Sequence, residues 1–217
     1  MYLSFAIFCE GPTDYSYLEV IIPKLISEII LQEGLRNIDV AEQPVLRLGR
    51  FGRAVDSVAQ EACSASGAFH LMFVHADTGG RALEEGLENR STAYCLAMNT
   101  KCNWPCERCI VAAPRHETEA WAMLDRNAIS GALGYTGDLL ALGLPRNAAQ
   151  IERLVDPKST LNGIISSVRG RRRSDSAYDL YPAIAARQEI IELRNARSFR
   201  TFETQVRDGL KSLGCIN

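Results

Sequence analysis

Two continuous apolar runs mark the strongest predicted strands of this chain. They cover residues 3–9 and residues 70–77, and each is followed by turn-forming glycine, proline or threonine residues. Short apolar runs bounded in this way are typical of buried strands. Residues 44–48 form a weaker strand candidate, and residues 108–113 form a short apolar run that ends at a proline.

Helical spacing of apolar residues fills the segments between these runs. It is clearest over residues 14–31, where apolar side chains recur every three or four positions. Helical patterns also cover residues 54–65, 81–98 and 117–125. Strands that alternate with helices imply crossover connections and a mostly parallel sheet. We therefore predict an α/β fold of the Rossmann-like kind, with helices flanking the sheet.

The strand signal stops after Asp125. Helical patterns continue to the end of the chain, over residues 146–154, 160–168, 182–194 and 199–213. We predict an α/β core over residues 1–125 and a helical C-terminal part over residues 126–217 that packs on it. No linker marks a boundary, so a single domain is the alternative.

The composition is that of a globular protein. The chain has 217 residues, of which 47% are hydrophobic and 23% are charged. These values exclude a disordered, collagen-like or coiled-coil chain. The net charge of −2 gives no general argument for a nucleic-acid or membrane partner. The charge is uneven, however: residues 1–119 hold 10 basic and 16 acidic side chains, and residues 120–217 hold 14 and 10.

The cysteines and the start of the chain bear on its compartment. Seven cysteines are scattered over the sequence, the first residues lack a secretory signal pattern, and no uncharged apolar stretch is long enough to span a membrane. We expect a cytoplasmic protein with free thiols and no membrane partner. A structural Zn²⁺ site is the less favoured interpretation of four cysteines that include only one CxxC pair: Cys95, Cys102, Cys106 and Cys109.

Acidic residues follow both strong strand candidates. Glu10 ends the first run, Asp77 ends the second, and Asp14 lies in the first turn of the helix after Glu10. Because ligands of parallel sheets bind beyond the carboxyl ends of the strands, these carboxylates are expected at one edge. Converging carboxylates repel one another unless a cation compensates them, and oxygen-rich sites suit Mg²⁺ or Mn²⁺. Alternatively, Asp14 caps the helix and Glu10 binds backbone amides of the loop.

These motifs resemble the Toprim pattern, in which Glu-Gly ends one strand and Asp-x-Asp ends another. The corresponding segments are Glu10-Gly11-Pro12-Thr13-Asp14 and His75-Ala76-Asp77-Thr78-Gly79. Toprim domains occur in topoisomerases, bacterial primases and nucleases of the overcoming-lysogenization-defect type. The order of motifs is similar to that of a family of small bacterial Toprim-like proteins, whose further marks resemble Glu117-Thr118-Glu119-Ala120-Trp121, Asp156-Pro157-Lys158, Tyr181 to Ala185 and Ser198-Phe199.

The resemblance implies a Mg²⁺- or Mn²⁺-dependent nuclease that acts on DNA or RNA. In this interpretation Glu10 is a general acid or base or a metal-shell residue, Asp77 is a metal ligand, and Asp14 is the second acid of its motif. Bound metal ions stabilise the attacking and leaving oxygens in phosphoryl displacement. The resemblance further implies a subunit of a bacterial defence system that works with a separate ATPase, and it leaves the oligomeric state open.

One residue departs from the pattern, because His75 stands where the first acid of Asp-x-Asp is expected. His75 and Asp77 are two apart on a strand and point the same way, so His75 is also a metal-ligand candidate. Imidazole suits Mn²⁺ or Zn²⁺ better than Mg²⁺. The change fits equally a catalytically degenerate Toprim-like module with a binding or regulatory role. A hydrogen-bonded histidine at a strand end is the structural alternative, and a small phosphate ester is a third substrate hypothesis.

Further charged residues complete the candidate site. Glu117 and Glu119 are metal-ligand candidates, but positions two apart on a helix face different directions, so the two are not expected to face one site together. The resemblance favours Glu119, which occupies the position that the family pattern holds most clearly, ahead of Trp121. Glu119 is also a catalytic candidate, and so is Lys158, as a cation that stabilises phosphoryl charge. The densest basic cluster of the chain is expected to contact nucleic acid. The alternative is that the cluster is simply an exposed loop. Its members are Arg169, Arg171, Arg172 and Arg173.

Overall fold

The computed structural model describes residues 1–75, 91–170 and 177–217. Its centre is a parallel sheet of four strands in the order β4-β2-β5-β6. The bounds of these strands are Leu46–Arg47 for β4, Phe5–Cys9 for β2, Leu71–His75 for β5 and Cys109–Ala112 for β6. Two shorter parallel strands form a second sheet, namely β1 (Tyr2–Leu3) and β3 (Asp39–Val40).

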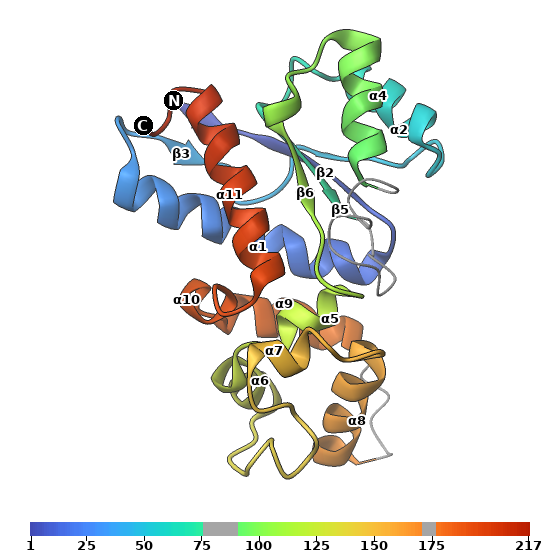
Figure 1. Ribbon diagram of the computed structural model, residues 1–217, viewed down its shortest axis with the longest axis vertical. Helices are drawn as coiled ribbons and strands as arrows, with labels where there is room; N and C mark the ends of the chain where they lie inside the picture. Colours follow the sequence, from blue (N-terminus) through green and yellow to red (C-terminus); the bar gives the residue numbers. More distant parts are fainter. Residues whose placement is uncertain (76–90, 171–176) are drawn as a thin grey trace.

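Alternate residues of the strands face two separate apolar layers. Phe5 and Ile7 of β2 pack in one layer with α1 and α11, whereas Ala6 and Phe8 pack in the other with α2 and α4. Figure 1 shows these helix pairs on either side of the strands. Because both faces are covered, β2 and β5 are apolar throughout, and the sequence shows them as continuous runs. The bounds of the four helices are Pro12–Glu33 for α1, Val55–Ser64 for α2, Thr92–Cys102 for α4 and Arg197–Ser212 for α11.

Short helices follow the last strand and form the C-terminal part. Figure 1 shows them grouped beyond the end of β6, where the chain enters α5. A single 3₁₀ turn, η2 (Cys106–Arg108), precedes β6. The helices after β6 are α5 (Thr118–Ala122), α6 (Arg126–Leu133), α7 (Ala148–Ile151), α8 (Pro157–Arg169), α9 (Ala177–Arg187) and α10 (Ile190–Leu193). The predicted α/β fold with a parallel sheet, flanking helices and a helical C-terminal part is confirmed.

The last helix returns from the C-terminal part to the sheet. The side-chain Oε1 of Gln205 in α11 accepts a hydrogen bond from the backbone N–H of Val111 in β6 at 2.9 Å. Phe202 of α11 lies against Phe73 of β5 and Trp121 of α5, with ring centroids 6.0 and 5.4 Å apart. One apolar core therefore includes side chains from both sides of residue 125.

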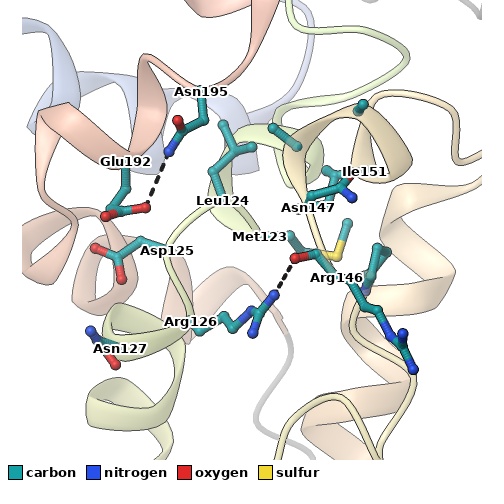
Figure 2. A pocket seen from close by; sticks show the side chains of 13 residues that line it. Met123, Leu124, Asp125, Arg126, Asn127, Arg146, Asn147, Ile151, Glu192 and Asn195 are labelled. Atoms are coloured by element: carbon teal, nitrogen blue, oxygen red, sulfur yellow. Dashed lines mark hydrogen bonds between the residues drawn. The ribbon is translucent and has the colours of Figure 1, made fainter.

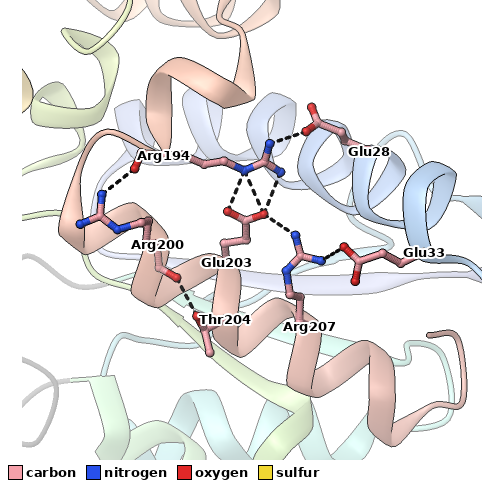
Figure 3. A network of polar contacts seen from close by, with 7 residues as sticks. All are labelled: Glu28, Glu33, Arg194, Arg200, Glu203, Thr204 and Arg207. Carbon is pink, nitrogen blue, oxygen red and sulfur yellow. Dashed lines mark hydrogen bonds and ion pairs between the residues drawn. The ribbon is translucent and has the colours of Figure 1, made fainter. Parts of the chain in front are cut away.

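A network of ion pairs fixes α11 to α1 and to the end of α10 (Figure 3). At its centre Glu203 accepts hydrogen bonds from Arg194 and, at 2.8 Å, from Arg207. Arg194 also pairs with Glu28 at 2.7 Å, and Arg207 pairs with Glu33. The network joins residues that lie more than 160 positions apart in the chain, so it stabilises the long-range packing of α11 on α1.

Several element boundaries differ from the prediction. The helix expected over residues 182–194 is divided into α9 and α10, and α6 was not expected. In the region predicted as a helix over residues 81–98, the described part contains α4, and residues 81–90 lie outside the described ranges. Within those ranges the structure contains no helix with the length and apolar content of a membrane span.

The cysteines are arranged differently from the expected free thiols. The sulfur atoms of Cys63 and Cys102 lie 2.18 Å apart and those of Cys95 and Cys109 lie 2.08 Å apart, so both pairs form disulfides. Cys106 is exposed on η2. The four cysteines considered for zinc are therefore not gathered around one point, because α2 supplies the partner of Cys102 and β6 supplies that of Cys95.

Candidate functional site

The strand order places a topological switch point between β2 and β5. From β2 the chain crosses to β4 on one side, and from β5 it crosses to β6 on the other. The crevice beyond the carboxyl ends of two such strands is the usual ligand site of open parallel sheets. Glu10 follows β2 directly at this edge. Asp77, which follows β5 in sequence, lies outside the described residues.

Asp14 is buried at the start of α1 and accepts hydrogen bonds on both carboxylate oxygens. Its Oδ2 accepts from the backbone N–H of Gly11 at 3.0 Å, which closes the first turn of the helix. Its Oδ1 accepts from the Thr118 hydroxyl of α5 at 2.7 Å. Asp14 thus caps its helix, which was one of the two roles predicted for it from the sequence. It also connects that helix to the segment after β6.

His75 ends β5 and is fully buried beside Asp14. Its Nδ1 donates to the carbonyl oxygen of Ala112 on β6 at 2.8 Å, and its Nε2 lies 3.6 Å from Oδ1 of Asp14. Burial by itself raises the pKa of Asp14, but the hydrogen bond and charge of His75 and the other donors outweigh that effect. The pKa of Asp14 is therefore lowered below its ordinary value, and the carboxylate is ionised at neutral pH.

Glu117 and Glu119 lie on the segment that leaves β6. Glu117 is extended, with φ −146°, and α5 begins only at the next residue. The sequence predicted that both acids lie on one helix and face different directions, but only Glu119 lies in the helix, so this constraint does not apply. Glu119 is 3% exposed, and its Oε2 lies 3.4 Å from the Thr118 hydroxyl. Thr118 therefore lies between the carboxylates of Asp14 and Glu119.

Tyr181 of α9 brings a buried hydroxyl to the same carboxylates. Burial is the main effect that raises the pKa of Tyr181 far above its usual value, and its interaction with Glu119 raises it further. The negative charges of Asp14 and Glu117 act in the same direction. The hydroxyl therefore keeps its proton. Sequence analysis noted Tyr181 only as part of a family motif, and it did not select Thr118 as a site residue.

Of the basic candidates, the structure describes Lys158 and Arg169. The backbone N–H of Lys158, at the start of α8, donates to Oε2 of Glu117 at 3.2 Å, while its side chain is exposed. Arg169 ends the same helix, about 16 Å further along its axis by the rise of 1.5 Å per residue. Three members of the predicted nucleic-acid cluster lie outside the described residues: Arg171, Arg172 and Arg173.

The donor set suits a hard cation that keeps water ligands. Among residues 1–75, 91–170 and 177–217, no three His, Cys, Asp or Glu side chains lie close enough to enclose a metal ion. Mg²⁺, however, is usually held by one or two carboxylates together with water and substrate phosphates. Glu10, which follows β2 at the switch point, is a carboxylate of the kind that Mg²⁺ uses. The ring nitrogens of His75 instead face Ala112 and Asp14.

A cavity of about 650 Å³ lies elsewhere, among the helices of the C-terminal part. Figure 2 shows its lining, in which Glu192 bonds to Asn195 and Arg126 bonds to the backbone of Arg146. Asp125 caps α6 through Ala128 N–H and Asn147 caps α7 through Gln150 N–H. Because Asp125 and Asn147 already accept hydrogen bonds from helix ends, the cavity is a weaker candidate for a catalytic site than the sheet edge. Its other lining residues include Met123, Leu124, Asn127 and Ile151.

Comparisons with protein-family models, curated proteins and solved structures found no match. Function is therefore inferred from the chemistry of the sheet edge. There Asp14, His75, Thr118, Glu119 and Tyr181 lie together, with Glu117 beside them.

Proposed function

We propose that this protein hydrolyses phosphodiester bonds of DNA or RNA in a Mg²⁺- or Mn²⁺-dependent reaction. One observation supports the proposal above the others: carboxylates from α1 and from the segment after β6, those of Asp14 and Glu119, lie on either side of the Thr118 hydroxyl beside the switch point of a parallel sheet. Carboxylates gathered in this way favour a cation and a substrate whose reaction the cation assists.

Each acid has a role in this proposal. Glu10 and Asp77 would hold the metal ion, which supplies a polarised water and stabilises charge on the phosphate. Glu119, flanked by Thr118 and facing Tyr181, would accept a proton from the water. Asp14 would position the site through its bonds to Thr118 and His75. The exposed ammonium group of Lys158 would contact the phosphate.

Metal binding is the first experiment, because a missing protein partner cannot obscure it. Mn²⁺ and Mg²⁺ are titrated into the wild type and into Glu10→Gln and Asp77→Asn by calorimetry, with and without an oligonucleotide. We expect binding in the wild type and at least a tenfold loss in both variants. Glu107→Gln is the matched control, since Glu107 is exposed on η2 and should leave binding unchanged. Cleavage of a labelled oligonucleotide is then measured for the same four proteins.

A binding or regulatory module without catalysis is the second candidate, and one observation favours it. His75 and Asp14, both proposed from the sequence as ligands, face each other in the protein interior and also bond to Ala112 and Thr118. If millimolar Mn²⁺ and Mg²⁺ fail to bind even with oligonucleotide present, the nuclease proposal is wrong and this alternative replaces it. The ATPase partner and the role in bacterial defence stay predictions from the resemblance.

A further inference from the structure

A cleft of about 450 Å³ lies where β2 and β4 end, directly beside the candidate site. Within the described part of the chain, Glu10 is the one acidic residue that lines it. Three arginines line it as well, namely Arg47, Arg50 and Arg53. The cleft therefore combines an excess of positive charge with a carboxylate that we place at the metal.

The loop after β4 carries Arg50 and Arg53, whereas Arg47 belongs to β4 itself, and the loop is fixed at its first turn. Gly49 N–H and Arg50 N–H both donate to Oε2 of Glu61 on α2, at 2.9 and 3.1 Å. Gly49 has φ +91°, and a Cβ atom there would lie 3.0 Å from the Phe8 ring. The backbone therefore approaches the sheet more closely than a residue with a side chain would allow.

Two tyrosine hydroxyls fix the rest of the loop. The Tyr15 hydroxyl of α1 donates to the carbonyl oxygen of Leu48 at 2.7 Å. The Tyr94 hydroxyl of α4 donates to the carbonyl oxygen of Arg53 at 2.9 Å. The loop is thus bonded to helices on both faces of the sheet. Its arginine side chains therefore extend from a backbone that these hydrogen bonds hold in place.

The three arginines differ in how their charge is compensated. Arg47 forms a two-point ion pair with Glu19, a residue of α1 whose side chain is 7% exposed. Arg50 and Arg53 are exposed, and no carboxylate within the described ranges pairs with either of them. The guanidinium group of Arg50 lies 5.9 Å from the centre of the Phe51 ring. Two uncompensated guanidinium groups thus stand at the entrance of a cleft that ends at Glu10.

We propose that this cleft binds a phosphate group of a polynucleotide backbone through Arg50 and Arg53. The guanidinium fork matches the oxygens of phosphate and binds them through two hydrogen bonds. The inference rests on the proposed function, since a phosphate held here adjoins the one cleaved near Glu10. It also assigns nucleic-acid contacts to the loop between β4 and α2, a segment different from the predicted cluster at residues 169–173.

The test measures binding without metal, so that it does not depend on catalysis. A fluorescein-labelled 20-base-pair DNA duplex and the corresponding single-stranded RNA are titrated with protein in EDTA, and anisotropy is recorded over a range of salt concentrations. We compare the wild type with the double variant Arg50→Gln/Arg53→Gln. The matched control, Arg153→Gln/Lys211→Gln, removes the same charge from exposed positions outside the cleft. Circular dichroism confirms that both double variants fold.

We expect the wild type to bind at least one polynucleotide and the arginine variant to bind it at least tenfold more weakly. Its plot of log affinity against log salt for duplex DNA should be shallower by about 0.9, since the variant loses its contact with one phosphate. The control should lose less than threefold.

Three results would overturn the inference: equal losses in both double variants, no polynucleotide binding in the wild type, or arginine-dependent binding of inorganic phosphate alone. If the arginine variant loses polynucleotide binding and the wild type binds no metal ion, the phosphate-binding role of the cleft is supported and the proposed nuclease activity is wrong.

Discussion

Asp14 shows how a single buried carboxylate is kept ionised in this protein. Removal from water disfavours its charge. Two hydrogen-bond donors compensate for that cost, the Gly11 N–H in its own helix turn and the Thr118 hydroxyl of α5, together with His75 of β5, whose Nε2 lies 3.6 Å away. Hydrogen bonds to an ionised group contribute about 1.5–3 kcal/mol each, more than bonds between neutral groups. The carboxylate therefore connects three elements that meet at the candidate site.

Thr118→Val should destabilise the protein without changing its shape. Valine has nearly the volume of threonine, but it lacks the hydroxyl that donates to Asp14 at 2.7 Å, so the ionised carboxylate loses one of its donors. We expect the free energy of unfolding to fall by about 1.5–3 kcal/mol. Urea denaturation at neutral pH measures it. Thr204→Val is the control, since Thr204 is exposed and its hydroxyl bonds only to its own helix, at Arg200. An equal loss in both variants would contradict this account of Asp14.

At the residue scale, the sequence identified the parts of the site but not their contacts. Glu10 and Asp14 were predicted from the turn that follows an apolar strand, which is local information. The approach of His75 to Asp14 and of Tyr181 to Glu119 depends on packing between segments far apart in the chain. Arg50 and Arg53 escaped prediction because two exposed arginines in a short loop carry no periodic signal.

At the element scale, prediction succeeded where one local pattern decides the structure. The strands β2 and β5 are buried on both faces, and α1 buries a regular apolar stripe. It failed at the break between α9 and α10. Gln188 at that break accepts from the Tyr17 hydroxyl at 2.7 Å and donates to the Trp121 carbonyl at 2.9 Å. The backbone at the break also bonds to distant side chains, because Glu189 N–H donates to Oδ2 of Asp125 at 3.0 Å and the ammonium group of Lys24 donates to the Gln188 carbonyl. The local sequence gives no sign of these partners.

The network on α11 makes a prediction about acid stability. Burial raises the pKa of Glu203, but the hydrogen bonds and charges of Arg194 and Arg207 outweigh it, so the pKa in the folded state lies below the usual 4.5. A lowered pKa stabilises the folded state above pH 4.5, and this contribution is lost as the pH falls through the folded value. We therefore expect Glu203→Gln to lower the free energy of unfolding by about 1–3 kcal/mol at pH 7.

Urea denaturation at pH 7 and at successive values below 4.5 tests this expectation. The difference between the wild type and Glu203→Gln should shrink as the pH decreases, because the wild-type carboxylate then becomes protonated. Glu42→Gln changes an exposed glutamate and should follow the wild type within about 0.5 kcal/mol. A difference that stays constant with pH would mean that the charge of Glu203 does not contribute.

At the scale of the whole molecule, the two predicted parts share one apolar core. Phe199 and Phe202 of α11 are buried against Trp121, which itself donates a hydrogen bond from Nε1 to Ser198 at 2.8 Å. Val206 and Leu210 continue this buried face. The chain thus leaves the sheet after β6, builds the helical part and returns to cover the sheet. The acids of the candidate site lie at the junction, where α5 and α9 meet the N-terminal end of α1.

Removal of α11 should therefore abolish cooperative folding of the remaining chain. A fragment of residues 1–195 would expose Trp121, Phe73 and one face of the sheet, and it would lose the ion pair of Arg207 with Glu33 on α1. Burial of a single large aromatic side chain already contributes about 3–5 kcal/mol, and α11 supplies two, so the loss is comparable with the whole stability of a domain. Thermal unfolding followed by circular dichroism should show no sharp transition, and the fragment should bind the dye ANS strongly. The full chain carrying Lys211→Ala, an exposed position on the same helix, should unfold at the wild-type temperature. A sharp transition in the fragment would show instead that residues 1–125 form a core that does not need the last helix.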